Sequence, residues 1–308
     1  DRLSAMFKPR KTIYAKVTYA DIAGLDGSAD KTGISGTLLN QLTQMDGFIH
    51  VVRGFEDDLI PHPSGNVDPL RDILAMDSEF ILNDLIAVER KLERLAEEKK
   101  KGAGRDKAVI ERETVLFERF NAALSEEKPL RDLTISAEEE KLLAGFGFLT
   151  RKPVLLVLNL SEGQAEPALV YTHQHTQVVS LQARLEMDIA QLPPEEAQLF
   201  LEEYHISEPS LNRMIRLSYD LLGLESFFTV GPDEVRAWTV RRGATAPEAA
   251  GEIHTDLQKG FIRAEVIAYD DLMALGGMVE GRAKGKLRLE GKEYIVKDGD
   301  ILNIRFNI

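Results

Sequence analysis

Apolar positions in the opening 67 residues alternate between strand-like and helix-like spacing. The stretch from Lys11 to Thr18 alternates apolar and polar positions as a strand does, and Gly47 to Val52 has the apolar density of a buried parallel strand. A glycine-rich loop and a helical stretch from Thr37 to Met45 lie between them. The order strand, loop, helix, strand predicts an α/β domain.

From residue 68 to residue 135 the spacing becomes that of two long helices. Apolar residues recur at three- and four-residue steps from Asp68 to Lys101 and again from Asp106 to Leu124, on either side of a glycine turn. A continuous first helix would extend about 50 Å at about 1.5 Å per residue. Length and charge favour an antiparallel coiled-coil arm, and two ordinary helices packed on the core are the alternative.

The α/β pattern resumes after residue 135. Pro153 to Leu160 has the composition of a second buried strand, Val178 to Leu181 that of a third, and helical spacing continues to Leu222. The arm is therefore predicted to be an insertion between strands of one sheet.

Beyond Gly223 the pattern changes to short strands and tight reversals, with one helix from about Ala246 to Lys259. About 85 residues of this kind predict a small α+β module. The predicted domains are the first part of the α/β domain at 1–67, the arm at 68–135, the second part of the α/β domain at 136–223, and the C-terminal module at 224–308.

Composition narrows the functional classes. A formal charge of −13 weighs against attraction of the whole surface to nucleic acid, so sequence-specific DNA binding is not expected, although 236–242 and 284–297 are locally basic. With no cysteine, a metal must be held by oxygen or imidazole ligands. No apolar run is long enough to span a membrane and no secretory signal opens the chain, so we expect a cytoplasmic protein.

Asp21-Ile22-Ala23-Gly24 follows the first predicted strand and fits the DxxG switch element of P-loop nucleotide hydrolases. In that element the carboxylate of Asp21 would hold Mg²⁺ through a water, and the amide of Gly24 would meet the γ-phosphate. Because aspartate and glycine favour turns for conformational reasons alone, an ordinary turn is the alternative.

Asn159-Leu160-Ser161-Glu162 follows a buried strand at the place where GTPases carry the base-reading sequence NKxD. Leu160 and Glu162 replace the lysine and aspartate of a guanine clamp, while Asn159 retains an amide that can exchange hydrogen bonds with adenine. An Asx turn that closes the strand is the alternative.

His62 lies in a loop with two prolines and two aspartates, Asp57 to Pro63. A histidine there could orient a water or move a proton near neutral pH, and a solvated loop side chain is the alternative. His50, inside an apolar run, is interpreted as a core histidine. His173 and His175 lack a third ligand nearby in sequence, so a metal site there is not predicted.

These motifs, taken in order, resemble the Obg-like, YchF-type family of P-loop ATPases. The resemblance begins with Asp21-Ile22-Ala23-Gly24-Leu25, continues with His50-Val51-Val52-Arg53 and reaches Asn159-Leu160-Ser161-Glu162. The segments that resemble the family's TGS domain are Glu234 to Thr239, Gly243 to Pro247, Ile253 to Asp256 and Lys259 to Ala264. Together they span essentially the whole chain.

The resemblance implies a P-loop α/β fold with a mostly parallel sheet, an inserted antiparallel helical arm and a C-terminal α+β TGS domain of ubiquitin-like fold. It implies Mg²⁺-dependent hydrolysis of ATP in preference to GTP, association with the ribosome, and a regulatory role in translation or the stress response. Leu25 stands where other hydrolases carry a catalytic glutamine, and His62 matches the histidine proposed to position water. Gln182 stands at the last base-contacting loop.

Three departures from the family pattern bear on function. The phosphate-binding GxxNxGKS loop would precede Asp1, which is not a methionine, so we interpret the chain as a fragment. The stretch from Asp26 to Gly36 lacks the glycine-rich GxGLGN pattern, and the segment from Glu162 to Val178 is short. The alternative function is therefore a nucleotide-independent adaptor that acts through its arm and TGS domain.

Overall fold

The computed structural model describes residues 1–22, 34, 36–101, 104–204, 206 and 208–307. Its contacts divide the chain into two compact units. One is Asp21–Leu221, and the other combines Asp1–Ala20 with Leu222–Ile308. Within the described residues, no helix has the length and apolar character needed to cross a membrane.

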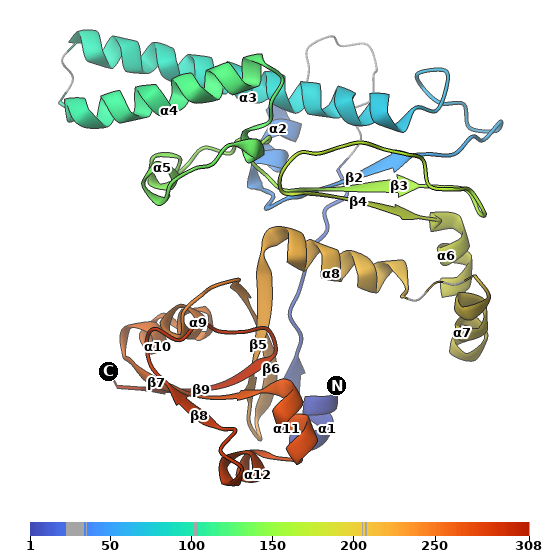
Figure 1. The fold of residues 1–308 in the computed structure, drawn as a ribbon, viewed down its shortest axis with the longest axis vertical. Helices are drawn as coiled ribbons and strands as arrows, with labels where there is room; N and C mark the ends of the chain where they lie inside the picture. The colour runs from blue at the N-terminus through green and yellow to red at the C-terminus, as the bar shows by residue number, and fades with distance from the viewer. Residues whose placement is uncertain (23–33, 35, 102–103, 205, 207, 308) are drawn as a thin grey trace. The chain divides into compact units, whose positions relative to one another are not determined.

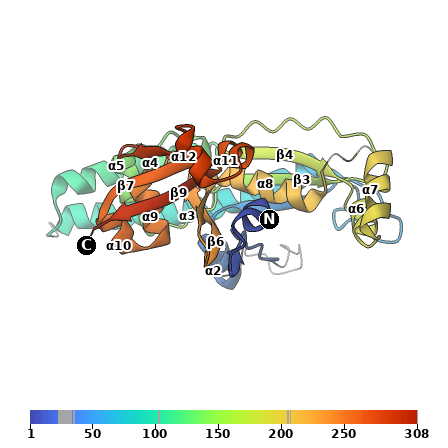
Figure 2. The ribbon, with the colours of Figure 1, turned by 90° about the horizontal axis from the view of Figure 1, so that it is seen from below.

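The unit Asp21–Leu221 contains a three-stranded parallel sheet (Figures 1 and 2). Its strands, in spatial order, are β2 (Phe48–Arg53), β3 (Val154–Asn159) and β4 (Thr176–Leu181). Only the last residue of β3 is not fully buried. Parallel strands with long connections are typical of α/β domains, so the predicted α/β fold is confirmed.

Helices make the connections of this sheet. The segment α2 (Gly36–Gln44) precedes β2, and α6 (Ala183–Ala190), α7 (Pro194–Glu203) and α8 (Ser210–Leu222) follow β4. Between β2 and β3 lie α3 (Pro69–Lys101), α4 (Lys107–Ser125), the short 3-10 helix η1 (Leu130–Asp132) and α5 (Ala137–Leu142). The capping box of Ser136 and Glu139 starts α5.

The inserted arm consists of α3 and α4, which lie antiparallel and side by side in Figure 1. Each helix buries one apolar stripe against the other, and the shared core includes Val88, Leu116, Phe117 and Phe120. At 33 residues, α3 is about 50 Å long. The predicted antiparallel helix pair is present, while the N-terminal part of α3 packs on the sheet through Ile73 and Phe80, as the alternative expected.

Charged side chains at the tip of the arm are mostly paired. Lys99 lies 2.9 Å from Glu111, Lys101 lies 2.9 Å from Glu97, and Arg105 contacts Glu98 at 2.9 Å and Glu113 at 2.5 Å. Lys100 is exposed, and its side chain has no ion pair within the described part of the chain. The acidic residues of the arm therefore offset most of the local positive charge.

A second sheet forms the other unit. Its spatial order is β1-β6-β5-β9-β7-β8, and the strands are β1 (Lys11–Ile13), β5 (Leu224–Val230), β6 (Glu234–Arg241), β7 (Phe261–Ala268), β8 (Arg288–Glu290) and β9 (Asp300–Phe306). Its helices are α1 (Arg2–Phe7), α9 (Ala246–Ile253), α10 (Thr255–Lys259), α11 (Tyr269–Leu275) and α12 (Met278–Ala283). This mixture is the predicted α+β module.

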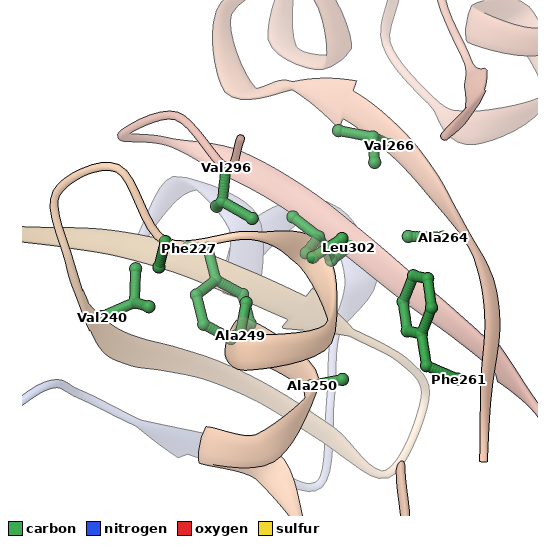
Figure 3. Close-up of a cluster of buried hydrophobic side chains, with 11 residues drawn as sticks. Phe227, Val240, Ala249, Ala250, Phe261, Ala264, Val266, Val296 and Leu302 are labelled. Atoms are coloured by element: carbon green, nitrogen blue, oxygen red, sulfur yellow. The ribbon is translucent and has the colours of Figure 1, made fainter. Parts of the chain in front are cut away.

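One buried cluster of this unit lies between the sheet and α9 (Figure 3), and another includes Leu3 of α1 and Leu272 of α11. Phe227, Val240 and Leu302 come from three strands and are almost fully buried. Ala249 and Ala250 are fully buried in α9. Because alanine has the smallest side chain with a Cβ, these two positions allow α9 to pack close to the strands.

The strand β1 corrects the predicted domain boundary of 1–67. Lys11 to Thr18 is expected to be a strand of the α/β domain, but β1 covers only Lys11–Ile13 and pairs in parallel with Glu234–Arg236 of β6. Residues 1–20 thus belong with the C-terminal unit. Alternating polarity predicts an extended backbone but does not select a partner strand, because pairing depends on residues far away in sequence.

Candidate functional site

The carboxyl ends of the three parallel strands bring the candidate base-reading residues together. The register aligns Arg53 of β2, Asn159 of β3 and Leu181 of β4. Gly54 N donates to the carbonyl oxygen of Asn159 at 2.8 Å, and Leu160 N donates to the carbonyl oxygen of Leu181 at 2.9 Å. Ligands in parallel α/β sheets bind at this edge, so the structure places the Asn159 motif on the side where a nucleotide is expected.

Gly54 is the residue that lets β2 and the Asn159 motif approach so closely. A Cβ at this position would lie 2.7 Å from Leu160 Cδ2 and 3.2 Å from the carbonyl oxygen of Asn159. A larger residue here would force the side chain of Leu160 to move and would crowd the carbonyl group of Asn159. The glycine therefore keeps the two strand ends in contact.

Asn159 has a fixed side chain. Its Oδ1 accepts a hydrogen bond at 3.1 Å from the backbone N of Ala183, the first residue of α6. Gln182 precedes that residue at the N-cap of α6 and makes no side-chain capping bond. The bond directs the amide of Asn159 across the strand ends and leaves Nδ2 as its donor group.

Leu160 and Glu162 differ sharply in environment. Leu160 is only 4% exposed and belongs to the apolar cluster that covers the sheet. Glu162 is exposed and hydrogen-bonds the hydroxyl of Tyr204 at the end of α7, which raises the pKa of Tyr204. The leucine is thus a packing residue, and the glutamate has a partner within the protein.

Gln164 fixes the loop and was not found from sequence. Its Nε2 donates to the carbonyl oxygen of Gly54 at 2.6 Å, and its Oε1 accepts from Ser161 N at 3.0 Å. These bonds link the end of β2 to the loop after β3. The only sequence signal is a polar residue three positions after Ser161, which is common in loops and therefore not diagnostic.

Asp21 begins this unit and is exposed, and the following Ile22 packs against the apolar cluster formed by α2, α3 and Leu149. Gly24 and Leu25 lie outside the described residues. No group of three acidic or histidine side chains suitable for a metal occurs in the described part of the chain. Asp21 therefore belongs to no such group within the described residues.

His62 is held by partners on both ring nitrogens. Its Nε2 lies 3.1 Å from Oδ2 of Asp72, and its Nδ1 accepts from Ser64 N at 3.2 Å. The side chain is 10% exposed. This geometry contradicts the alternative of a freely solvated loop histidine.

Arg53 braces the loop that leads to His62. Its Nε donates to the carbonyl oxygen of Phe55 at 2.9 Å, and its Nη1 donates to that of Ile60 at 2.7 Å. The guanidinium also lies over the ring of Phe55, with 4.8 Å between Cζ and the ring centroid. Because Arg53 is aligned with Asn159, it connects the base-reading edge to the His62 loop.

His50 and His173 each have partners or neighbours within the protein. His50 is half-buried in β2, and burial lowers its pKa, although the negative charges of Asp77 and Asp72 oppose this effect. His173 Nδ1 lies 2.7 Å from Oδ2 of Asp132. The predicted core position of His50 agrees with this placement.

Comparisons with known proteins identify relatives along the entire chain. A ribosome-binding ATPase YchF of Bacillus subtilis (strain 168) is 42% identical, over all of this chain and 86% of the relative. The protein of the same name in Escherichia coli O157:H7 is 41% identical with the same coverage. The Obg-like ATPase 1 of Oryza sativa subsp. japonica is 35% identical, over all of this chain and 80% of the relative.

A solved structure and a family model agree with these relatives. The structure of the Schizosaccharomyces pombe YchF GTPase matches with a TM-score of 0.80 and 30% identity, over 98% of this chain and 84% of that one. Residues 224–307 match the family model YchF-GTPase_C, described as "Protein of unknown function (DUF933)". The chain therefore belongs to the YchF and Obg-like ATPase family of P-loop nucleotide hydrolases.

Proposed function

We propose that this chain forms the greater part of a cytoplasmic, ribosome-associated hydrolase that uses ATP in preference to GTP and regulates translation or the stress response. Relatives named ribosome-binding ATPases support the reaction and the partner. The observation that carries the nucleotide preference is the environment of Leu160 and Glu162 at the carboxyl edge of the sheet.

A guanine-reading loop needs an available carboxylate and a long side chain that covers the base. Aspartate in NKxD accepts hydrogen bonds from the N1 and N2 donors of guanine. Here Glu162 is one methylene longer and is bonded to Tyr204, and Leu160 is buried in the core. The Nδ2 group of Asn159 can donate to N7 of adenine, and Oδ1, which already accepts from Ala183 N, has a second lone pair for the N6 donor.

Asp21 supports a magnesium site completed by the nucleotide. Mg²⁺ usually takes one or two carboxylates and fills its other positions with water and phosphate oxygens, so an exposed carboxylate such as that of Asp21 suits it. When bound, the ion would offset charge on the transferred phosphoryl group. Asp21 would hold its water ligand, and we propose that a phosphate-binding loop upstream of Asp1 supplies the remaining contacts.

His62 is proposed to position the attacking water. The brace from Arg53 and the two ring contacts hold the imidazole in one orientation, as a water-positioning group requires. His62→Ala should slow single-turnover hydrolysis and leave the affinity for ATP unchanged, because the contact strengthens in the transition state. Equal rates for the variant and the parent protein would remove His62 from the mechanism.

Ribosome contact is proposed for the arm tip and the C-terminal unit. An acidic protein needs local positive charge to bind an RNA-rich particle. Ion pairs occupy Lys99, Lys101 and Arg105, whereas Lys100 is exposed and has no ion pair in the described part of the chain. In the C-terminal unit, Arg241 and Arg263 are exposed, whereas Arg236 stacks over Trp238 at 3.7 Å.

Calorimetric titration of the full-length protein with ATP and with GTP tests the nucleotide preference. We expect ATP to bind at least about tenfold more tightly, a difference of about 1.4 kcal/mol. GTP that binds tenfold more tightly would contradict the proposal. Absence of heat with either nucleotide, together with normal cosedimentation with ribosomes, would indicate the adaptor function instead.

A further inference from the structure

We propose that Asp72 is the positioning residue that orients His62 for its role in nucleotide hydrolysis. The inference rests on the proposed function of His62 and adds the residue through which the arm helix α3 fixes the imidazole. Oδ2 of Asp72 lies 3.1 Å from Nε2 of His62. Both side chains are largely shielded, with 10% of His62 and 23% of Asp72 exposed.

The hydrogen bonds around the ring select one tautomer. The backbone N of Ser64 can only donate, so Nδ1 of a neutral His62 is the acceptor. The proton of the neutral ring must then be on Nε2, where the carboxylate of Asp72 accepts it. A carboxylate that fixes the tautomer of a catalytic imidazole is an arrangement found on unrelated folds.

Nδ1 is consequently the nitrogen that faces the water. In this conformation Nδ1 accepts from the N–H of Ser64 at 3.2 Å and lies 3.5 Å from Nη2 of Arg71, and both are long contacts of the kind that an incoming water can replace. Asp72 keeps the other nitrogen engaged during that exchange. The attacking water would then donate to Nδ1 while the ring stays in place.

Asp72 is itself fixed by its neighbours. It lies in the first turn of α3, where the helix dipole favours a negative charge. Its Oδ1 accepts from Nε of Arg71 at 2.9 Å, and the guanidinium of Arg71 also contacts Asn66, through Oδ1 at 2.8 Å and the carbonyl oxygen at 2.9 Å. Several hydrogen bonds therefore fix the segment between the His62 loop and α3, and Asp72 links these bonds to the imidazole.

Asp72→Asn in the full-length protein tests the assignment. The asparagine amide can donate to Nε2, which removes the preference for the proton on that nitrogen. We expect single-turnover ATP hydrolysis to slow by about 10- to 100-fold with ATP affinity unchanged, since misplacement of a catalytic group costs this much. The ¹⁵N spectrum of the His62 imidazole, assigned with His62→Gln, should lose the Nε2–H tautomer.

Three further variants make the outcome decisive. Asp58→Asn removes an exposed carboxylate from the same loop and should leave rate and spectrum unchanged. Asp72→Glu keeps the acceptor and should recover part of the rate. Asp72→Asn in the His62→Ala background should cause no further loss of hydrolysis rate, because each substitution alone already removes the function of the Asp72–His62 pair.

The possible results separate this inference from the function of His62. If His62→Ala hydrolyses ATP at the parent rate, the proposed role of His62 fails. If His62→Ala is slow but Asp72→Asn retains the parent rate and tautomer, the role of His62 stands and that of Asp72 is overturned. An equal loss from Asp72→Asn with and without His62 would also overturn it, since Asp72 would then act independently of the ring.

Discussion

Asp84 in α3 is 3% exposed and anchors the backbone that precedes β3. Its carboxylate accepts from Leu149 N at 2.9 Å, from Thr150 N at 2.7 Å and from Thr150 Oγ1 at 2.6 Å. Burial raises its pKa from 3.8 to about 6, although these hydrogen bonds oppose the shift. The side chain joins the arm to the sheet at an electrostatic cost near neutral pH.

This raised pKa predicts a pH dependence of stability. Between these two pKa values the carboxyl group of Asp84 is protonated in the folded state and ionised in the unfolded state. Its contribution to the free energy of unfolding is therefore largest below about pH 4 and falls as the pH rises through about 6. Between the low-pH and high-pH limits, this contribution to the free energy of unfolding changes by on the order of 3 kcal/mol. The stability advantage of the parent protein over Asp84→Asn should therefore shrink from about pH 4.5 to about pH 7.5 in urea unfolding. A constant or growing advantage would contradict this explanation.

At the scale of single residues, the sequence predicts which element or loop carries a side chain better than it predicts which distant residue that side chain contacts. It predicted Asn159 at a strand end and His62 in a nearby loop, because strand ends and proline loops leave local signals. It did not predict the contacts of Glu162 with Tyr204 or of Gln164 with Gly54. Those pairs are 42 and 110 residues apart, and no periodicity relates such positions.

At the scale of elements, long patterns were predicted well and pairings poorly. The arm was predicted because nine turns of α3 repeat the same apolar spacing, roughly one turn per 3.6 residues. The stretch from Lys11 to Thr18 is predicted to belong to the other sheet because alternation within one stretch cannot distinguish the edge of β6 from another edge. Ahead of β9, Ile295 forms only an isolated antiparallel bridge with Thr245.

Lys152 is an element-scale contact that caps α2. Its Nζ donates to the carbonyl oxygen of Thr43 at 2.9 Å and to that of Met45, at the C-terminal end of the helix. Burial lowers the pKa of Lys152, and the charges of Asp46 and Asp84 oppose this effect. A cation at a helix C-terminus also interacts favourably with the helix dipole.

Lys152→Met should loosen the last turn of α2. A charge-assisted hydrogen bond contributes about 1.5–3 kcal/mol, so amide exchange in residues 41–44 should accelerate by about tenfold or more. Hydrogen exchange with mass spectrometry checks this at peptide level. Lys128→Met, at an exposed lysine beyond α4, is the control and should leave the α2 peptides unchanged. Identical protection in both variants would show that the carbonyls of α2 do not depend on Lys152.

At the scale of the whole molecule, the chain and the RNA-rich ribosome are both negatively charged. We therefore expect the proposed binding to use local basic surfaces of the protein. The net charge is −13, and ion pairs offset most cations at the arm tip. Exposed ion pairs contribute only about 0–1 kcal/mol each, so their main effect is on the local potential. Lys100 is consequently a tip residue whose charge reversal breaks no ion pair among the described residues.

Lys100→Glu should weaken cosedimentation with ribosomes and lower its salt dependence. Loss of one phosphate contact reduces the slope of log affinity against log salt by about 1. Lys128→Glu carries the same charge change beyond the end of α4 and should behave like the parent protein. ATP hydrolysis without ribosomes should be equal in all three proteins. Equal ribosome binding by the two variants at every salt concentration would show that the tip is only solvated.

The central claim is that the site at the carboxyl edge of the sheet hydrolyses ATP in preference to GTP. The most direct measurement is kcat/KM for ATP and for GTP, determined in the same mixture with the full-length protein and Mg²⁺. We predict a ratio of at least about ten in favour of ATP, because Asn159 retains an adenine-compatible amide and Glu162 is bonded to Tyr204. A ratio of one or less, or no hydrolysis of either nucleotide, would contradict the account.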